Sequence, residues 1–443
     1  MSTALVHGLA ITGTSVIRAL RNRGYDVMCS DDRNTEDNRA TADQLGVKVH
    51  LAPTDSELRG LVDGCDFVVP APGVRELHPV RMIAAELGKS CVSELYLAYE
   101  WESARAGGGR PMVAVTGTDG KTTTTSLTAH IIREAGLKVI EAGNTDVPLV
   151  EAIDDHDIDA FVVECSSFRL ANINKFRTKA STWLNFSPDH LDWHSSLDTY
   201  RGAKERIWAN ATAEDVAVYP VGSQSIADVA KRSEARKVSF GIYADYTVSG
   251  GALTAHGTPI MSVATMWRTL PHDIDNSLAA AALAIESGLA TAEHAEQGIA
   301  TFVPPHHRIE FINEIDGVRW YDDSKATTPH AARAAIRSFH SVVLIAGGRN
   351  KDLDLSELAL EKDHIKAVVA TGEGIDAITA VFAGVKPVYP AHSMTEAVLV
   401  AASVATAGDT VLLSPACTSF DWYRNYNERG DDFVRCVREV LGS

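Results

Sequence analysis

A glycine turn followed by a lysine and a threonine is the stretch of this sequence best suited to chemistry. Residues 112–125 read M-V-A-V-T-G-T-D-G-K-T-T-T-T. Gly117 and Gly120 let backbone N–H groups converge on phosphate oxygens, and Lys121 supplies a positive charge for the outer phosphates. The Thr122 hydroxyl is a suitable ligand for Mg²⁺. The stretch therefore predicts a nucleoside triphosphate site.

The residues on either side of this turn predict the elements that hold it. Met112 to Val115 are apolar or small and predict a short buried strand, and the run from Lys121 to about Gly136 predicts a helix. Val115 stands where the usual phosphate-loop pattern has its first glycine. The alternative is a fortuitous Gly-Lys-Thr helix start without a nucleotide.

An acid and two histidines follow later strands at positions suited to a metal. Glu164 ends the predicted strand Ala160 to Val163, and an acid downstream of a phosphate loop positions Mg²⁺ against the nucleotide. His190 and His194 are four residues apart and on a helix would share a face, where both could bind one zinc ion. Pro188 and the surrounding aspartates favour a loop with a Mg²⁺–phosphate site, and a solvated acidic turn is the plainer alternative.

Two strand ends near the N-terminus are candidate ligand sites. Residues 3–9, a helix ending near Gly24 and residues 25–30 predict a βαβ unit that closes on Asp31 to Arg33. Ala10 occupies a glycine position of the dinucleotide motif, which disfavours a nicotinamide site. The turn at residues 71–73 follows a strand where open α/β sheets bind ligands, and a plain tight turn is equally consistent.

Strand–turn–helix alternation predicts an α/β fold with three domains: 1–108, 109–303 and 304–443. The first and third are expected to be Rossmann-like, and the second a P-loop ATPase-like parallel sheet. Gly-rich residues 104–111 predict the first hinge, and Pro304-Pro305 the second boundary.

Three further segments carry specific expectations. Residues 215–265 predict a small antiparallel patch. An Ala-rich helix from Ser277 to Ser287 is expected, capped by His272, Asp273 and Asn276 and ended by Gly288. Asp316-Gly317 predicts a hairpin at the start of the last third.

The overall composition disfavours several classes of protein. The chain has 443 residues, 45% of them hydrophobic, and a net charge of −17, which disfavours nucleic-acid and anionic membrane surfaces. Six scattered cysteines form no C-x-x-C pair and indicate reduced thiols. No signal-peptide pattern and no apolar run of about 18 residues occurs, so a cytoplasmic protein is expected.

In the order and content of its sequence motifs, the chain resembles the Mur ligases, the ATP-dependent amide-forming enzymes of peptidoglycan precursor synthesis. The matching segments are G-T-D-G-K-T-T at 117–123, G-N at 143–144, E-C-S-S-F at 164–168, D-H-L-D at 189–192, Y-R-G-A-K at 200–204, H-R at 307–308, D-S-K-A-T at 323–327 and L-S-P-A-C-T-S-F-D at 413–421. The central set is shared with folylpolyglutamate synthase. The last two segments and the short N-terminal domain point to the glutamate-adding branch.

The resemblance implies two Mg²⁺ ions and ATP at the central motifs. Thr122 and Glu164 would bind one ion; Glu164 and His190 would bind the other, assisted by Lys204, which is carbamylated in this family. Without the resemblance, Lys204 would be read as a surface helical lysine. The residues implied to contact ATP are Gly117, Thr118, Asp119, Gly120, Lys121, Thr122, Thr123, Asn276, His307, Arg308, Asp323 and Lys325.

The resemblance also implies two substrates, UDP-N-acetylmuramoyl-L-alanine and glutamate, with D-glutamate the expected enantiomer, joined through an acyl phosphate by a monomeric enzyme. The uridine diphosphate would lie on Ile11, Thr12, Asp31, Asp32, Arg33, Pro72 and Gly73. Asn144 would contact the muramoyl substrate or phosphate, and Ser166 would contact a substrate. The glutamate pocket would comprise Thr327, Lys351, Ser419, Phe420 and Tyr426.

Four positions depart from the family pattern: Asp119, Arg169, Asp273 and Thr328. Two other readings stay open. One is a ligase for L-glutamate or another amino acid, on the same or a folate substrate. The other is a phosphate-loop NTPase switch, which would hydrolyse nucleotide without an amino acid.

Overall fold

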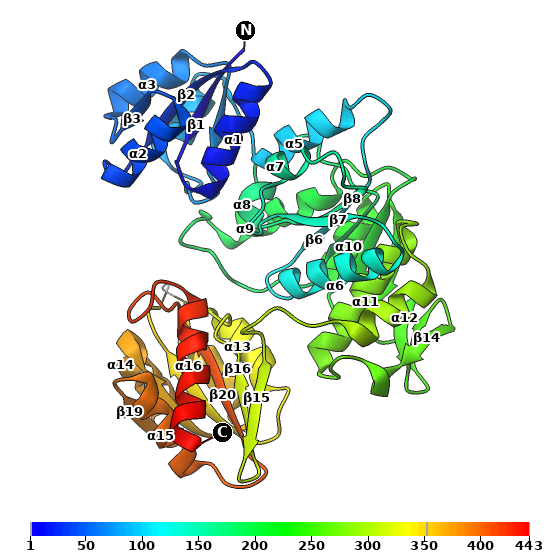
Figure 1. Ribbon diagram of the computed structural model, residues 1–443, viewed down its shortest axis with the longest axis vertical. Helices are drawn as coiled ribbons and strands as arrows, with labels where there is room; N and C mark the ends of the chain where they lie inside the picture. The colour runs from blue at the N-terminus through cyan, green and yellow to red at the C-terminus, as the bar shows by residue number, and fades with distance from the viewer. Residues whose placement is uncertain (1, 351–352, 443) are drawn as a thin grey trace. The chain divides into compact units, whose positions relative to one another are not determined.

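Three separate sheets organise the computed structural model, which describes residues 2–350 and 353–442 (Figure 1). The chain divides into two units. One comprises residues 1–269 with 273–302, and the other residues 270–272 with 303–443. The α/β fold class is confirmed. No helix of the described residues is long and apolar enough to cross a membrane.

The N-terminal sheet is parallel and has the strand order β3-β2-β1-β4-β5. Alternate residues of β1 face opposite sides: Val6 packs in the core that includes α1, and Leu5 packs with α3 and α4. The strands are β1 Thr3–His7, β2 Asp26–Asp31, β3 Val49–Leu51, β4 Phe67–Pro70 and β5 Ser90–Cys91. The helices are α1 Ile11–Asn22, α2 Glu36–Leu45, α3 Asp55–Asp63, α4 Pro79–Glu86 and α5 Glu94–Ser103.

The central sheet has the order β14-β13-β12-β11-β10-β9-β6-β8-β7. Its strands are β6 Met112–Thr116, β7 Val139–Gly143, β8 Ala160–Glu164, β9 Ala180–Trp183, β10 Val216–Pro220, β11 Arg236–Phe240, β12 Tyr246–Ser249, β13 Ala252–Ala255 and β14 Thr258–Ser262. The predicted antiparallel patch is wrong for its first half, because β10 and β11 are parallel. Within this sheet, only β12 to β14 pair antiparallel among the described residues. The reason is the crossover helix α10 Gln224–Arg232, which permits a parallel return.

Helices cover both faces of the central sheet. The apolar residues of α6, α11 and α12 belong to one core, and those of α7 and α10 to the other. The helices of this region, including α8 and α9, are α6 Lys121–Glu134, α7 Leu149–Ala152, α8 Ser167–Leu170, α9 Leu197–Glu205, α10 Gln224–Arg232, α11 Pro271–Glu286 and α12 Ala292–Thr301; η1 Arg206–Trp208 and η2 Val263–Thr265 are 3₁₀ turns.

The Ala-rich helix starts earlier than predicted. Helix α11 begins at Pro271, so Asp273 and Asn276 lie inside it as buried residues and do not cap it. Proline is favourable in the first helical turn, and Asp273 forms an ion pair with Arg268. These two contributions explain why the helix begins before the polar residues that were expected to cap its N-terminus.

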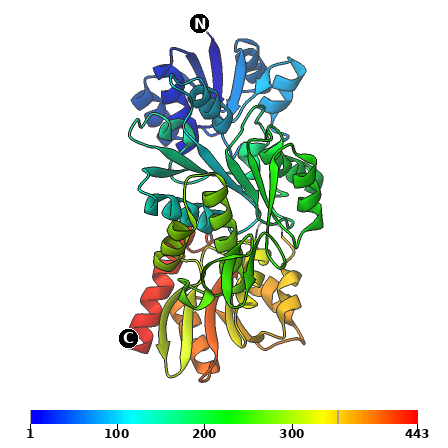
Figure 2. The ribbon, with the colours of Figure 1, turned by 90° about the vertical axis from the view of Figure 1, so that its right-hand side faces the viewer.

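The C-terminal sheet is mixed, with the order β15-β16-β20-β17-β18-β19 and an antiparallel edge strand β15. The predicted hairpin at Asp316-Gly317 is confirmed by the pairing of Ile315 with Val318. Helices α15 and α16 share a core on one face, and α13 and α14 share one on the other; Figure 2 shows α16 in red beside the strands. The elements are β15 Glu310–Ile315, β16 Val318–Asp322, α13 Pro329–Ile336, β17 Val342–Gly347, η3 Leu355–Glu361, β18 Ile365–Thr371, η4 Gly372–Gly374, α14 Ile375–Phe382, β19 Val388–Ala391, α15 Met394–Val404, β20 Thr410–Ala416 and α16 Tyr426–Leu441.

Candidate active site

The predicted strand, glycine turn and helix form as expected, as β6, residues 117–120 and α6. Gly120 caps the helix with φ +79°, a left-handed conformation that side chains disfavour. A Cβ at Gly120 would stand 2.6 Å from Asn276 Oδ1, so this turn also requires glycine for space. The four threonines after Lys121 are poor helix formers, and burial of Thr123, Thr124 and Thr125 holds them helical.

Asn185 fixes the shape of the turn, a role that the sequence did not reveal. Its Oδ1 accepts hydrogen bonds from the backbone N–H groups of Thr118, at 3.0 Å, and Asp119, at 2.9 Å. Its Nδ2 donates to the Asp119 carbonyl at 3.1 Å. The Thr118 hydroxyl lies 3.1 Å from that of Tyr200. Asn185 lies two residues after the end of β9, at the start of the segment N-F-S-P-D.

Two lysines converge on the carbonyls of the same turn. Lys121 Nζ donates to Gly117 O at 3.0 Å and Thr118 O at 2.8 Å. Lys204 Nζ, from α9, donates to Gly117 O at 2.6 Å. Lys204 is 1% exposed, and burial, followed by repulsion from Lys121, lowers the pKa of its ammonium well below the ordinary value. A lysine buried in this way is poised to react as a neutral amine.

Glu164 ends β8 beside the phosphate turn. Strand β8 pairs with β6 so that Glu164 stands opposite Val115, and with β7 so that it stands opposite Gly143. Asn144 Nδ2 donates to Glu164 Oε1 at 2.8 Å. Glu164 Oε2 is buried and has no hydrogen-bond partner. A buried carboxylate oxygen without a partner is costly unless a cation or a donor satisfies it, so Glu164 fits a metal ligand.

His190 lies on an irregular turn with φ +56° and does not share a helix face with His194. Its ring packs 4.6 Å from Phe168 and 6.0 Å from Tyr200, and its Nε2 lies 3.2 Å from Asp189 Oδ2. Tyr200 also lies under Lys204, whose Nζ is 4.8 Å from the ring centroid. His190 and Lys204 therefore share Tyr200 as a neighbour.

His194 is a buried structural residue. Its Nε2 lies 2.9 Å from the Ser167 hydroxyl, and burial lowers the pKa of its ring to about 4. No group of three metal-binding side chains includes His190 or His194 within the described part of the chain. The zinc interpretation of this histidine pair therefore has no geometric support.

The other predicted central residues occupy the same region with differing exposure. Thr122 is half-buried in the first turn of α6, while Thr123 is buried. Asn276, in α11, accepts a hydrogen bond at 3.2 Å from the Thr124 hydroxyl of α6. The Ser166 hydroxyl, just after β8, is buried without a partner.

The residues predicted to bind uridine diphosphate gather at the carboxyl edge of the N-terminal sheet. Asp31 accepts from the Leu9 N–H at 2.8 Å, and although burial opposes it, hydrogen bonds from Leu9 and Arg33 lower the pKa of its carboxyl. Asp32 lies between two histidines, His7 and His78. The remaining members are exposed Ile11, half-buried Thr12, and Pro72 and Gly73 in the turn after β4.

Arg169, one of the four departures from the family pattern, is a second residue whose role the sequence did not reveal. It is buried, pairs with the buried Glu94, and donates from Nη2 to the Thr12 hydroxyl at 3.1 Å. Glu94 also accepts from the Val150 N–H. Arg169 thus links the segment after β8 to a residue predicted to contact the uridine diphosphate.

In the C-terminal unit, the predicted nucleotide contacts cluster around the end of β16. His307 Nδ1 lies 2.6 Å from Asp322 Oδ2; burial opposes protonation, but Asp322 raises the pKa of the His307 ring. Asp323 accepts from the Ser414 hydroxyl at 2.7 Å, and burial raises the pKa of its carboxyl to about 7. Arg308 and Lys325 flank these residues in sequence, next to His307 and two positions after Asp323.

The residues predicted to form the glutamate pocket belong to this unit, and Tyr426 is next to a predicted nucleotide contact. Lys325 Nζ lies 5.1 Å from the Tyr426 ring centroid, and the Tyr426 carbonyl accepts from Ser324. Thr327 follows this turn, buried Ser419 and exposed Phe420 lie in the turn after β20, and Lys351 falls outside the described residues.

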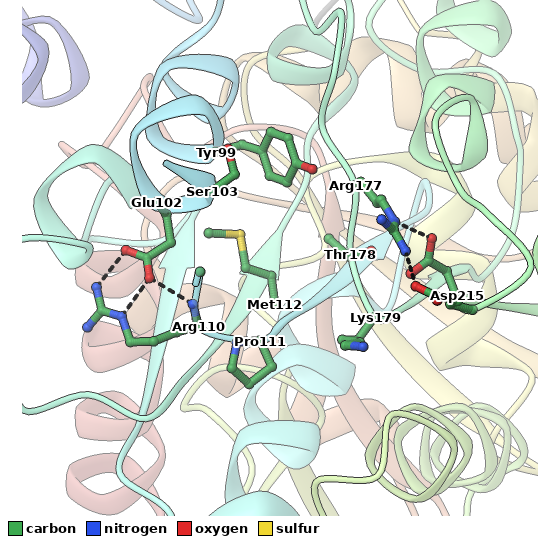
Figure 3. A pocket seen from close by; sticks show the side chains of 12 residues that line it. Tyr99, Glu102, Ser103, Arg110, Pro111, Met112, Arg177, Thr178, Lys179 and Asp215 are labelled. Carbon is green, nitrogen blue, oxygen red and sulfur yellow. Dashed lines mark hydrogen bonds and ion pairs between the residues drawn. The ribbon is translucent and has the colours of Figure 1, made fainter. Parts of the chain in front are cut away.

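A cavity of about 280 Å³ opens at the opposite edge of the central sheet, where β6 begins (Figure 3). Four of its charged residues form ion pairs with one another: Arg110 with Glu102, and Arg177 with Asp215 at 2.6 Å. It lies at the amino end of the strand whose carboxyl end carries the phosphate turn. The cavity is therefore separate from the candidate active site.

Comparison with known proteins matches two regions of the chain to families. The family described as Mur ligase middle domain matches residues 115–284, and that described as Mur ligase, glutamate ligase domain matches residues 307–417. A UDP-N-acetylmuramoylalanine–D-glutamate ligase of Alkaliphilus metalliredigens is 34% identical, covering 99% of this chain and 98% of its own. A ligase of the same name from Frankia casuarinae is 37% identical, with coverages of 99% and 94%.

Solved structures with the same fold are more distant in sequence. UDP-N-acetylmuramate-alanine ligase MurC from Thermotoga maritima superimposes with a TM-score of 0.60 at 19% identity, covering 99% of this chain and 100% of its own. MurF from Acinetobacter baumannii gives 0.59 at 16% identity, covering 98% and 93%. E. coli FolC gives 0.55 at 19% identity, covering 79% and 91%.

Proposed function

The chain belongs to the Mur ligase family, and we propose that it is the ATP-dependent ligase that adds D-glutamate to UDP-N-acetylmuramoyl-L-alanine during peptidoglycan precursor synthesis. The single observation that carries this proposal is similarity over nearly the whole chain, at 34% and 37% identity, to ligases named for that reaction. The grouping of Lys121, Lys204 and Glu164 at one edge of the central sheet supports it.

The reaction must convert a poor leaving group into a good one. A carboxylate oxygen of the muramoyl-alanine attacks the γ-phosphorus of ATP, which releases ADP and forms an acyl phosphate. The amine of glutamate then attacks the acyl carbon, and phosphate leaves with the original carboxylate oxygen. Both reacting partners of the first step are anionic, so positioning and charge neutralisation dominate catalysis.

The phosphate turn and Lys121 are suited to the ATP phosphates. Thr122, Glu164 and His190, with modified Lys204, are the residues that would hold two Mg²⁺ ions, which lower the repulsion between phosphoryl group and carboxylate when bound. The buried, unpartnered Oε2 of Glu164 supports this assignment. Asn144, which is bonded to Glu164, would orient that carboxylate.

We propose that Lys204 is carbamylated. Its lowered pKa favours the neutral amine, which attacks CO₂ to give a carbamate and one released proton. The product carries a negative charge where the lysine carried a positive one, and so becomes a metal ligand. Carbamylation also removes the repulsion between Lys204 and Lys121, which contributes to the low pKa.

Three domains suit three substrates: residues 1–108 for the uridine diphosphate, 109–303 for ATP and 304–443 for glutamate. The C-terminal residues His307, Arg308, Asp323 and Lys325 would reach the nucleotide, and closure of the domains would exclude water from the acyl phosphate. Lys351 belongs to the proposed glutamate pocket. We propose a cytoplasmic monomer.

Phosphate release separates this proposal from its alternatives. The enzyme is supplied with ATP, Mg²⁺ and UDP-N-acetylmuramoyl-L-alanine, and each of a panel of D- and L-amino acids is added in turn. Release that requires D-glutamate supports the proposal. Equal release with L-glutamate, or a requirement for a folate acceptor, would identify a different ligase, and release without any amino acid would identify an NTPase switch.

A further inference from the structure

Two histidines and an aspartate meet at the carboxyl edge of the N-terminal sheet, on a different sheet from the phosphate turn; the aspartate, Asp32, also belongs to the predicted uridine diphosphate site. His7 ends β1, Asp32 follows β2, and His78 precedes α4. One ligand atom from each lies within 4.8 Å of the other two. We propose that His7, Asp32 and His78 form a binding site for a divalent ion of the zinc class.

The separations of these atoms suit a small tetrahedral ion. His7 Nε2 lies 3.3 Å from Asp32 Oδ1, and His78 Nε2 lies 2.9 Å from Asp32 Oδ2. Ligands bound about 2.0–2.1 Å from a tetrahedral centre are about 3.4 Å apart, so an ion would require only small movements of these side chains. The exposed Asp32 carboxylate, whose side chain is 57% accessible, can rotate to admit it.

The His7 ring is already fixed in the orientation that ligation requires. It is 1% exposed, and its Nδ1 lies 2.8 Å from the Ser30 hydroxyl. This bond anchors the ring through one nitrogen and directs the other, Nε2, toward Asp32. An outer hydrogen bond on the distal nitrogen is the usual arrangement around a metal-bound histidine.

His78 gives an ion access to the site from solvent, but binding the ion would break one hydrogen bond of His78. Its Nδ1 accepts from the Val80 N–H at 3.2 Å and caps helix α4. A metal on Nε2 places the ring proton on Nδ1 and removes this long bond, so the ion must compensate for it. The side chain is 17% exposed, which leaves a path for the ion from solvent.

The donor set selects the class of ion. Two imidazoles and one carboxylate suit zinc and its neighbours, whereas Mg²⁺ prefers oxygen ligands alone. Three protein ligands leave a fourth position open for water or another oxygen donor. This inference concerns the protein without substrates and does not depend on the proposed ligase activity.

Metal titration of the full-length chain tests the site. The protein is stripped with a chelator and titrated with Zn²⁺ by calorimetry in excess Mg²⁺, which occupies oxygen-rich sites, and with Co²⁺ while its visible absorption is recorded. We expect one Zn²⁺ whose affinity falls at least tenfold in Asp32→Asn and in His78→Ala, with loss of the tetrahedral Co²⁺ bands. Asp26→Asn, at the exposed opposite end of β2, is the matched control and should bind as the wild type does.

Two further variants locate any additional ions. Glu164→Gln removes the proposed active-site ligand and His307→Ala a ligand of the C-terminal group of His307, Glu310 and Asp322, and the N-terminal Zn²⁺ should persist in both. Thermal unfolding in the presence of chelator verifies that each variant is folded. The proposal is overturned if Asp32→Asn and His78→Ala, both folded, bind Zn²⁺ with the wild-type stoichiometry and affinity, or if the wild type binds none.

Discussion

Lys204 of the central domain and Asp323 of the C-terminal unit are buried ionisable groups of opposite sign at comparable places. Each lies near the carboxyl edge of a largely parallel sheet, where open α/β folds bind ligands. Burial lowers the pKa of Lys204 and raises that of Asp323 to about 7. In both sheets, burial disfavours the charged form of an ionisable side chain at the edge that carries the predicted phosphate contacts. Shifted pKa values of this kind are typical of functional sites.

The two groups affect stability in opposite directions with pH. The folded chain binds fewer protons at Lys204 than the unfolded chain does, so stability rises as pH increases toward 10.5, the ordinary lysine value. The folded chain keeps the Asp323 proton longer, so stability falls as pH rises from about 4 to about 7. The comparison can be tested by removing each group.

The largest effect is expected at Lys204. Lys204→Ala removes the proposed carbamate ligand, and ligase activity should fall by roughly a hundredfold or more, because charge stabilisation at the phosphoryl group is lost. Short carboxylates such as formate should restore part of the activity. Lys231→Ala, an exposed lysine of α10, serves as the control and should retain full activity. Absence of rescue would count against the carbamate.

Glu164→Gln should have the next largest effect. Its Oε1 can still accept from Asn144, so the local structure is kept while the charge that would hold Mg²⁺ is lost. Activity should fall by about 10–100-fold and the Mg²⁺ concentration for half-maximal rate should rise. Steady-state rates across a Mg²⁺ series measure this, and an unchanged Mg²⁺ dependence would remove Glu164 from the metal site.

Asp323→Asn tests the other side of the comparison through stability. Between pH 4 and pH 8 the wild type should lose stability as Asp323 ionises, and the variant should not. The free energy of unfolding of the variant minus that of the wild type should therefore rise by about 2–4 kcal/mol, since a shift of three pKa units is worth about 4 kcal/mol. Urea unfolding at both pH values, with hydrogen exchange of β16 and β20 amides, reports on this unit. A difference that does not change with pH would show that Asp323 titrates normally.

The smallest effect is expected at Asp119, a departure from the family pattern in the phosphate turn. Asp119→Asn removes a negative charge near the expected triphosphate while leaving its backbone bonds to Asn185 in place. The KM for ATP should fall about two- to fivefold, because two charges near 4 Å interact by about 1 kcal/mol in water. An increase in KM would indicate that Asp119 assists nucleotide binding.

Local sequence signals predicted the elements of the phosphate site well. Five buried residues before Gly117 and the Gly-Lys-Thr turn are encoded within one short stretch, and β6 and α6 form as expected. The strand end at Glu164 followed from the same kind of local pattern.

Local sequence patterns could not predict the properties that arise from contacts between distant segments. Burial of Lys204 depends on α9 packing against a turn far away in sequence, and nothing in Y-R-G-A-K distinguishes it from a surface lysine. The bridging of the turn by Asn185 and the pairing of Arg169 with Glu94 likewise join distant segments. The parallel pairing of β10 and β11 was missed because α10, a helix of nine residues, was not recognised as the crossover between them.

Oxygen transfer from substrate to phosphate tests the central claim most directly. UDP-N-acetylmuramoyl-L-alanine carrying oxygen-18 in its carboxylate is incubated with ATP, Mg²⁺, D-glutamate and the enzyme, and the released phosphate is analysed by mass spectrometry. Activation through an acyl phosphate predicts one labelled oxygen in each phosphate formed. Amide product accompanied by unlabelled phosphate would contradict the account.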